Sequence, residues 1–499
     1  MRAARVPSRV RRAVARLVPT SATRRALLLL GATVFFASAA LQSTTSGWNV
    51  TTRLDLVLAI VDHGEVTIDR YHDTPPYDTN DKAFYDGHFY SDKTIGLTML
   101  AVPVYAAARV VAAVAGHTLS AADTLWVLSR GAVSTTAALA AMLLAALLIR
   151  LGAVPRKAVL ATAGMFFGSM LFGYSTVFMP YLPGIAACLG ALLILLSPPL
   201  TAWRAAAIGG LLGFALILDL MFVFAVAAIV VLLLARLRPL GWRRGSRLAV
   251  ATGGAALVPI GILVGYCIAI FGSPSIPYKY EYDDFFREEM AKGVMGATMP
   301  KPNVMWFLSF HPYRGLLFWS PWIAMIIVCS VWILRRDRRL RPLAIAAIVV
   351  FGAYFVFNSG YYLWWGGAAM GPRLMLPMFG VVPLVLAVAC RADSPRWMWR
   401  ALVATLVIGV ALSLPVSMVE PGTAEGNTIA QLLDPPVGAH LSVPQLDRLG
   451  SFYSLQWSQI VPSGVGKAAG HWLLCLAIVF AGTWLAHRTA RRGERAEPV

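Results

Sequence analysis

Three basic residues stand where polar stretches of the sequence give way to long apolar runs. Lys93 precedes one such run, Arg314 lies in HPYRG and Arg373 lies in MGPR. A lysine offers a point charge to a phosphate, and an arginine offers a planar fork of donors. Long basic side chains also occur at membrane borders because their ends reach water. Three cations at one depth favour a converging site for a phosphate or pyrophosphate over three separate anchors.

Two carboxylates are candidates for a catalytic base. Asp55 falls on the polar face of residues 53–63, whose apolar positions have helical spacing and which Gly64 is placed to end. Asp92 directly precedes Lys93. A partly desolvated carboxylate can take the proton of an acceptor hydroxyl. Asp55 is the first candidate and Asp92 the second, and a solvated surface acid is the alternative for both.

Aromatic and imidazole side chains surround these charges in the sequence. Rings present flat faces to sugar C–H groups, and tyrosine and histidine add polar atoms. An aromatic belt at the membrane surface would have a similar composition. The residues expected to contact a sugar or an acceptor are Tyr85, His88, Tyr90 and Tyr313.

The elements that carry these residues are membrane-spanning helices. Of the 499 residues 58% are hydrophobic and 13% charged, whereas soluble proteins carry about a quarter charged residues. Many apolar runs approach the length of about 20 residues that crosses a bilayer. The five cysteines lie in apolar runs without CxxC spacing, so neither disulfides nor a cysteine metal site is expected. The predicted fold class is an all-α polytopic membrane protein of about 11–13 transmembrane helices with a large first extracytoplasmic loop.

The distribution of arginine predicts the topology. Eight arginines lie in residues 1–25, five in 236–247, five in 335–341 and four in 488–495. Short basic tracts beside apolar runs stay in the cytoplasm, and the net charge of +19 therefore does not indicate a nucleic-acid partner. The expected parts are a basic cytoplasmic N-terminus, a transmembrane domain and a cytoplasmic tail, at residues 1–25, 26–486 and 487–499. The outer loops are expected at about residues 43–93, 272–312, 358–373 and 419–466.

One part of this topology stays open. The number of crossings between residues 94 and 236 must be odd, yet the sequence shows six apolar segments there. Residues 205–235 can be read as one long helix or as two half-helices broken near Asp219. The loop that holds Arg150, Arg156 and Lys157 would then lie outside, against the charge rule.

Acidic residues follow the same topology independently. Of 24 Asp and Glu, nine lie in residues 43–93, five in 272–312 and four in 419–466. A transporter more often concentrates charged residues at the bilayer midplane, where Asp219 is the one clear candidate. The chemistry is therefore expected on the outer face of the cytoplasmic (inner) membrane.

Three segments of the sequence resemble those of the GT-C membrane glycosyltransferases, closest to the protein O-mannosyltransferases and the lipid A aminoarabinose transferase. They are GHFYSDKTIGLTMLAVPVY (Gly87–Tyr105), SFHPYRGLLFWSP (Ser309–Pro321) and YYLWWGGAAMGPRLMLP (Tyr361–Pro377). The resemblance implies inverting transfer of a sugar from a polyprenyl-phosphate donor, with Lys93 at the donor phosphate. The acidic pair that these relatives carry after the first helix falls at Asn49-Val50 here, and Asp55 is the nearest acid.

The sequence therefore predicts a polyprenyl-phosphate-dependent glycosyltransferase whose acceptor is an envelope glycan, lipid or protein. Its other partners are membrane lipids. Other GT-C branches use a divalent metal, but no ligand spacing here demands one, so no metal ligands are assigned. Two alternatives stay open, a lipid-linked sugar flippase or transporter and a non-catalytic envelope-assembly protein.

Overall fold

The computed structural model describes residues 20–40, 47–311, 314–367, 370–419 and 465–496. Within these ranges the chain is almost entirely helical, apart from a hairpin of β1 (Lys82–Tyr85) and β2 (His88–Ser91). Eight described helices are long and apolar enough to cross a membrane, and α9 (Tyr181–Leu195) and α10 (Ala202–Leu218) are shorter apolar helices. The predicted all-α polytopic fold class is confirmed.

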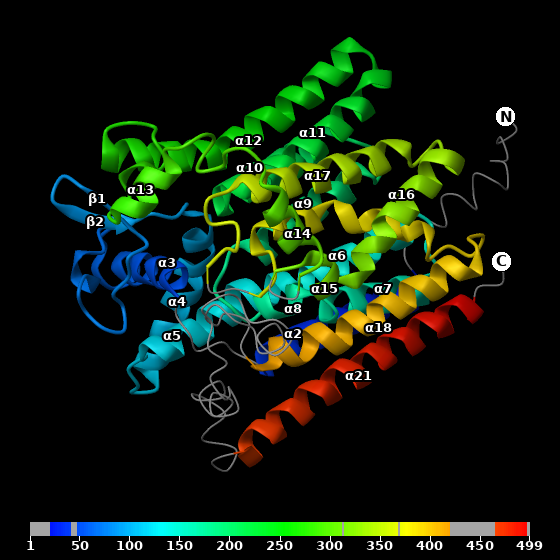
Figure 1. The fold of residues 1–499 in the computed structure, drawn as a ribbon, viewed down its shortest axis with the longest axis horizontal. Coiled ribbons are helices and arrows are strands. Elements are labelled where there is room, and N and C mark those ends of the chain that lie inside the picture. Colours follow the sequence, from blue (N-terminus) through cyan, green and yellow to red (C-terminus); the bar gives the residue numbers. More distant parts are fainter. Residues whose placement is uncertain (1–19, 41–46, 312–313, 368–369, 420–464, 497–499) are drawn as a thin grey trace, which may run out of the picture.

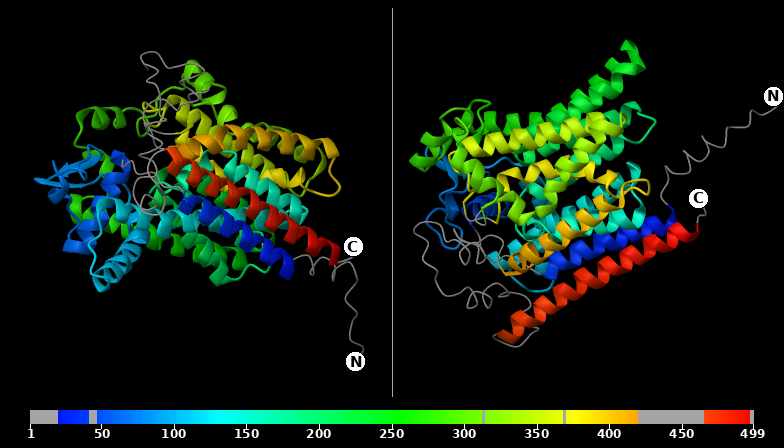
Figure 2. Two further views of the ribbon diagram at one scale, coloured as in Figure 1. Left: turned by 90° about the horizontal axis from the view of Figure 1, so that it is seen from below. Right: turned by 45° about the vertical axis from the view of Figure 1, so that its right-hand side comes forward.

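The bundle has two unlike ends (Figure 1). We call the end that carries β1, β2 and α3 (Trp48–Leu58) the loop end, and the opposite end the arginine end. Helices α2 (Ser21–Ala40) and α21 (Val465–Ala496) lie side by side along the bundle (Figure 2). They are antiparallel, since Gly482 packs against Thr33 and Gly493 against Ala22. The beginning of α2 and the end of α21 therefore lie together.

A continuous helix then crosses back beside α2. It consists of α5 (Ala121–Leu128), the π-helical η3 (Ser129–Ser134) and α6 (Thr135–Arg150). Arg130 Nη2 donates to the Ala39 carbonyl at 2.7 Å, whereas Met142, further along, packs on Gly31. This antiparallel register carries the chain from the loop end to the arginine end at Arg150.

Helix α4 (Gly96–Val114) explains why counting apolar segments left the topology open. It is long and apolar enough to span a membrane, but it begins beside the end of α10, where Thr94 Oγ1 donates to the Leu218 carbonyl at 3.0 Å. Its later residue Arg109 pairs, at 3.2 Å, with Asp62 of η1 (Ala59–His63), the π-helical turn that continues α3. The chain then enters α5 at the loop end. Because α4 adds no crossing, the count from there to α11 is odd, as the charge rule requires.

The other crossings and the short elements complete the chain. The crossings are α7 (Pro155–Phe167) with α8 (Met170–Tyr174), α9, α10, α11 (Val223–Leu237), α12 (Trp242–Phe271), α16 (Ala324–Arg336), α17 (Arg341–Gly360), the 3-10 segments η8 (Arg373–Gly380) and η9 (Val382–Val388), and α18 (Arg396–Val419). The short elements are η1 (Ala59–His63), η2 (Asp69–Tyr71), η4 (Leu220–Phe222), η5 (Arg238–Leu240), η6 (Pro277–Tyr280), α13 (Asp284–Met290), α14 (Pro302–Ser309), α15 (Leu316–Trp319) and η7 (Pro321–Ile323).

Ion pairs join the basic tracts at the arginine end. Arg391 Nη1 lies 2.8 Å from Asp337, and Arg156 Nη1 lies 3.2 Å from Glu494. Lys157 Nζ donates to the Arg391 carbonyl at 3.2 Å. The loop of Arg156 and Lys157, which the sequence left open, thus lies with the other arginine tracts. The membrane side of each end and the predicted domain limits stay predictions.

Candidate functional site

Buried charge gathers at the loop end of the described chain. Its buried charged residues are Arg53, Asp55, Lys82, Asp92, Lys93, Arg130, Glu281 and Arg314. Six of these eight lie in α3, in β1, directly after β2, or in the segment bridged to β1, the exceptions being Arg130 and Arg314. Charged groups are buried only at a cost unless they are paired or used. This end of the bundle is therefore the candidate site.

Helix α3 places two of these charges on opposite faces. It begins after Gly47, continues into the π-helical η1 and stops at Gly64, whose φ of +70° confirms the predicted terminator. Arg53 and Asp55 are two residues apart, about 200° around a helix. The sequence predicted a surface helix with Asp55 partly desolvated on its polar face, whereas Arg53 is 3% exposed and Asp55 is fully buried. The two side chains therefore lie in different environments.

Lys93 lies among three acids. Its Nζ is 3.0 Å from Asp81 and also pairs with Asp92. Glu281 comes from the distant segment after η6, because an isolated β-bridge joins it to Ala83 in β1. Burial lowers the pKa of Lys93, but Asp81 and then Asp92 more than offset this, so the pKa stands well above its ordinary value. Lys93 is a charged ammonium at neutral pH.

Asp92 and Glu281, two of the acids around Lys93, have raised pKa values. Burial raises the pKa of Asp92, and Lys93 offsets part of this rise. Burial, followed by the neighbouring Asp92, raises the pKa of Glu281 to about 10. A side-chain hydrogen bond joins the two carboxyl groups, so one of them carries the proton. At neutral pH Glu281 is therefore neutral, and Asp92 contacts both Glu281 and Lys93.

The end of α10 fixes the position of Lys93. The bond from Thr94 to Leu218 holds the turn, and a Cβ on Gly96 would come within 2.5 Å of the Ile217 carbonyl, so only glycine fits this close approach. Asp219 follows directly, and its Oδ1 accepts a bond from Met221 N at 2.9 Å. Of the two readings left open, the structure has the break: Asp219 caps η4 between the separate helices α10 and α11. It lies at the loop end, however, and not midway along the bundle, where a midplane residue was expected.

Three cations converge beside Asp219. Arg53, Lys93 and Arg373 all lie close enough to interact with its carboxylate. The Nε and Nη1 atoms of Arg53, and the Nε of Arg373, are buried without hydrogen-bond partners in the described chain. Tyr278 lies beside Lys93, with its ring centre 5.3 Å from Lys93 Nζ. Unused donors on clustered cations are suited to the oxygens of a phosphate.

Arg53 and Tyr278 were missed by sequence reasoning. Arg53 carried a local signal, since it is a basic residue within the predicted helix 53–63. Its neighbour Asp219, by contrast, comes from a segment more than a hundred residues away. Tyr278 carried no local signal that distinguishes it from other residues of the predicted outer loop 272–312.

Arg314 has a different environment from the other predicted phosphate ligands. Its Nε donates to the Trp365 carbonyl at 2.7 Å, and its Nη2 donates to the Gly367 carbonyl at 2.9 Å. Arg373 lies against the same turn, which uses positive φ at Gly366 and Gly367. The structure thus brings Lys93 and Arg373 together, and Arg314 supports the turn beneath Arg373.

Asp55 does not join the Lys93 cluster. Its electrostatic neighbours are Lys82 and Asp78, and both of its oxygens are buried without a hydrogen-bond partner in the described chain. Burial raises the pKa of Asp55 to about 9, although Lys82 lowers it. A carboxyl that is protonated at neutral pH cannot accept a proton. Of the two candidate bases, only Asp92 lies beside Lys93.

The predicted sugar-contacting residues are also separated. The rings of Tyr85 and Tyr90 pack on Phe271 of α12, with centres 5.5 Å and 5.7 Å away. His88 is exposed, and its Nδ1 lies 2.7 Å from Asp69. Tyr313 lies outside the described residues. The two tyrosines therefore fill the junction between the hairpin and α12.

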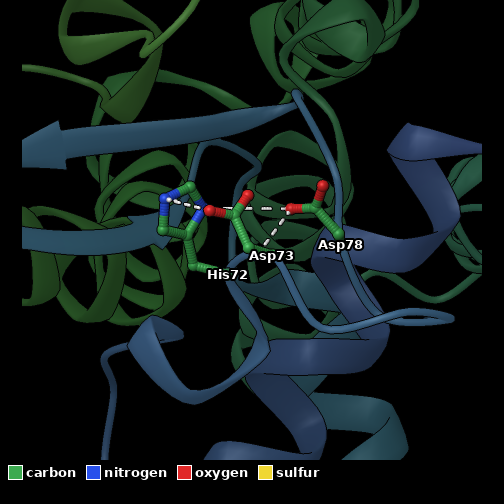
Figure 3. Close-up of side chains that lie close together, drawn as sticks. All are labelled: His72, Asp73 and Asp78. Carbon is green, nitrogen blue, oxygen red and sulfur yellow. Dashed lines mark hydrogen bonds and ion pairs between the residues drawn. The ribbon is translucent and has the colours of Figure 1, made fainter.

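One group of described residues has the ligand types for a metal, namely His72, Asp73 and Asp78 (Figure 3). Lys82 Nζ lies 3.0 Å from Asp78 Oδ1 and 2.6 Å from His72 Nδ1. The ammonium group competes with a metal ion for Asp78 and His72, two of the three ligands. No metal is assigned to this group.

The bundle, its loop-end cation cluster and the hairpin that delivers Lys93 define a polytopic membrane protein with the fold of the GT-C glycosyltransferases. The structure is similar to that of ArnT, a lipid A aminoarabinose transferase, from Cupriavidus metallidurans. With ArnT bound to undecaprenyl phosphate the TM-score is 0.52 at 16% identity, over 92% of this chain and 74% of that chain. With apo ArnT it is 0.51 at 17% identity, over 94% and 77%. No family model and no curated protein matches the sequence. The predicted GT-C fold is confirmed.

Proposed function

We propose that this protein transfers a sugar from a polyprenyl-phosphate donor to an acceptor at the loop end of the bundle. The observation that carries this proposal is the convergence of Arg53, Lys93 and Arg373, two of them with buried donors that bond to nothing in the described chain. The ArnT structure of the same fold was determined with undecaprenyl phosphate bound. A lipid phosphate is a ligand that would use these donors.

The three cations act on the leaving group. As the acceptor oxygen bonds to the anomeric carbon, the bond from that carbon to the phosphate oxygen breaks, and the phosphate keeps the electron pair. The growing negative charge is stabilised by preorganised cations in a site with little water. Arg314 contributes by holding the turn of Trp365 and Gly367, against which Arg373 lies.

Asp92 is the base in this scheme. It takes the proton of the acceptor hydroxyl as the oxygen attacks, and the single displacement inverts the anomeric configuration. In this scheme Asp92 is the ionised member of the Asp92–Glu281 pair, because Lys93 favours its charged form, while Glu281 holds its own proton beside it. Asp55, the first candidate from the sequence, is protonated and faces Lys82, so we assign it no proton transfer.

The loop end faces outward in this proposal. Short arginine-rich tracts stay in the cytoplasm, so the arginine end is the inner end of a cytoplasmic-membrane protein. Nucleotide sugars are cytoplasmic, and a transferase with an outward site therefore needs a donor carried on lipid. The acceptor is an envelope glycan, lipid or protein.

The position of buried charge separates this proposal from a flippase. A transporter of charged lipid-linked sugars would line a path through the membrane with polar groups. Across the described ranges, the buried charged residues instead gather at the loop end. A fixed site on one face suits transfer better than passage.

The direct test is transfer from radiolabelled polyprenyl-phosphate sugars by the purified protein in liposomes that contain a cell-envelope extract as acceptor. We expect incorporation with at least one donor. Lys93→Ala and Arg373→Ala should each lower it ten- to a hundredfold, since a hydrogen bond to a charged group contributes about 1.5–3 kcal/mol.

Arg109→Ala is the matched control, because Arg109 is also a loop-end cation but pairs with Asp62 away from the cluster. It should transfer like the parent. Absence of transfer from every donor by folded protein would refute the proposal. Equal losses in all three variants would show that loop-end charge in general is required, and not this site.

A further inference from the structure

The β1–β2 hairpin has one face turned away from the bundle. Its register pairs Phe84 with Phe89 and Tyr85 with His88. Side chains alternate between the faces of a strand, so Phe84, Phe89 and Lys82 share one face. Ala83, Tyr85 and Tyr90 share the other, which packs on α12. The outward face therefore needs a separate explanation.

Two phenylalanines and a tyrosine form an aromatic platform on this face, consisting of Phe84, Phe89 and Tyr282. The ring centres of Phe84 and Phe89 are 4.9 Å apart, and those of Phe89 and Tyr282 are 5.2 Å apart. Tyr282 is held in place because its N–H donates to the Lys82 carbonyl at 2.8 Å. Phe84 is 45% exposed and Tyr282 is 43% exposed.

Lys82 stiffens the platform from below. Its side chain is 2% exposed, and its Nζ lies 5.0 Å from the centre of the Phe89 ring and 5.3 Å from that of Tyr282. A cation over two ring faces holds both rings in place. His72 adds an edge, with its ring centre 4.0 Å from that of Phe89. The exposed rings thus belong to a fixed surface that joins two distant loops.

Hydrated carboxylates border the platform. Asp73 and Asp78 lie beside His72 (Figure 3), and their side chains are 80% and 38% exposed. Asp69, at 38% exposed, bonds to the Phe89 N–H at 2.6 Å. Sinking these rings into lipid would strip water from the carboxylates, which is costly. An anionic partner would also be repelled.

A neutral glycan complements both the rings and the carboxylates of this surface. Its C–H faces stack on rings, and its hydroxyl groups donate to carboxylates. We propose that the aromatic platform binds the neutral sugar chain of a glycan acceptor, away from the reacting hydroxyl. That the glycan is an acceptor rests on the proposed function, whereas the binding does not.

Binding is measured without turnover, by saturation-transfer NMR of the full-length protein in detergent with neutral hexose and pentose oligosaccharides of increasing length. We expect binding that strengthens with length. Phe84→Ala and Tyr282→Ala should each weaken it by roughly tenfold, because each ring buries apolar surface against the sugar. Tyr282→Phe keeps the ring and should retain binding.

Trp242→Ala is the control, since Trp242 is an exposed aromatic at the arginine end. It should bind like the parent. If no oligosaccharide binds the folded parent, or if Phe84→Ala and Tyr282→Ala bind like it, the inference is wrong. Binding without any sugar transfer would leave it standing and would count against the proposed function alone.

A second measurement distinguishes a glycan surface from a membrane anchor. Phe84→Cys, carrying a nitroxide label, is placed in lipid nanodiscs, where the five native cysteines are buried and do not compete. We expect a water-soluble relaxing agent to reach the label more readily than oxygen dissolved in lipid does. The reverse preference would place the platform in the bilayer and overturn the inference.

Discussion

Replacing Arg53 by methionine should stabilise the protein and impair it at once. Arg53 is 3% exposed, and its Nε and Nη1 donors bond to nothing in the described chain. A buried polar group left unsatisfied costs about 1–3 kcal/mol. Methionine removes these donors and keeps much of the volume, so the free energy of unfolding should rise by an amount of that order. Asp219 keeps Lys93 and Arg373 as neighbouring cations.

Donor binding should move in the opposite direction. If the free donors of Arg53 contact the lipid phosphate, their loss should weaken binding ten- to a hundredfold, equivalent to about 1.5–3 kcal/mol for one bond to a charged group. Thermal inactivation in detergent reports the first effect. Equilibrium binding of a radiolabelled polyprenyl phosphate in nanodiscs reports the second.

Arg314→Met is the matched comparison, because Arg314 is also a buried loop-end arginine. Its guanidinium bonds to the carbonyls of Trp365 and Gly367, which the substitution would leave without these donors. Stability should therefore fall together with donor binding. An Arg53→Met protein that is destabilised like Arg314→Met would show that Arg53 is a structural residue, and the assignment of its free donors to a ligand would be refuted.

The remaining predictions concern protons and topology. Asp55→Asn should keep activity at neutral pH, because the pKa of Asp55 is raised to about 9 and the group is already neutral. The folded state then holds a proton that the unfolded state releases above about pH 4, so parent stability relative to Asp55→Asn should fall as pH rises from about 4 to about 9, as denaturant unfolding across pH would show. Asp92→Asn should lower turnover by about 10²–10⁴-fold with donor still bound, and full activity would move the base elsewhere. A reporter active only outside the cytoplasm should work when fused at Asp81 or Lys292 and fail at Arg338, and the inverse pattern would remove the need for a lipid-linked donor.

The helical architecture could be predicted because it depends on properties that are read directly along the sequence. Apolar run length and arginine position predict helices and their ends. These two quantities do not identify the position of α4, because α4 is as long and as apolar as a membrane-spanning helix. What keeps α4 at the loop end is a set of contacts with distant residues, the bond of Thr94 to Leu218 and the pair of Arg109 with Asp62. Neither contact can be recognised from the composition of the sequence around α4.

The candidate site was predicted in part, for a related reason. Lys93 and Arg373 stood out because a cation at a loop–helix border is unusual, and the structure brings both to Asp219. Asp55 was chosen because it falls on the polar face of the predicted surface helix, but the sequence does not show which distant charges that face meets. Two positions on α3 are enough to turn Asp55 toward Lys82 and Arg53 toward Lys93 and Asp219.

The same rotation has a chemical consequence for the acid pair that the resemblance leads one to expect at Asn49-Val50. If that pair supplied the base in relatives, this chain needs a carboxylate from another segment, and α3 does not provide one because Asp55 is neutral and turned away. In the proposed scheme this carboxylate is Asp92, which enters from the end of the hairpin, pairs with Lys93 and lies beside Glu281 from the segment after η6. The base and a phosphate-binding cation are then neighbours in sequence, so any change in the hairpin moves both together. In the proposed scheme this coupling requires a fixed hairpin, and the hairpin is held on both sides, to α12 through Tyr85 and Tyr90 and to the segment after η6 through the bridge of Ala83 to Glu281.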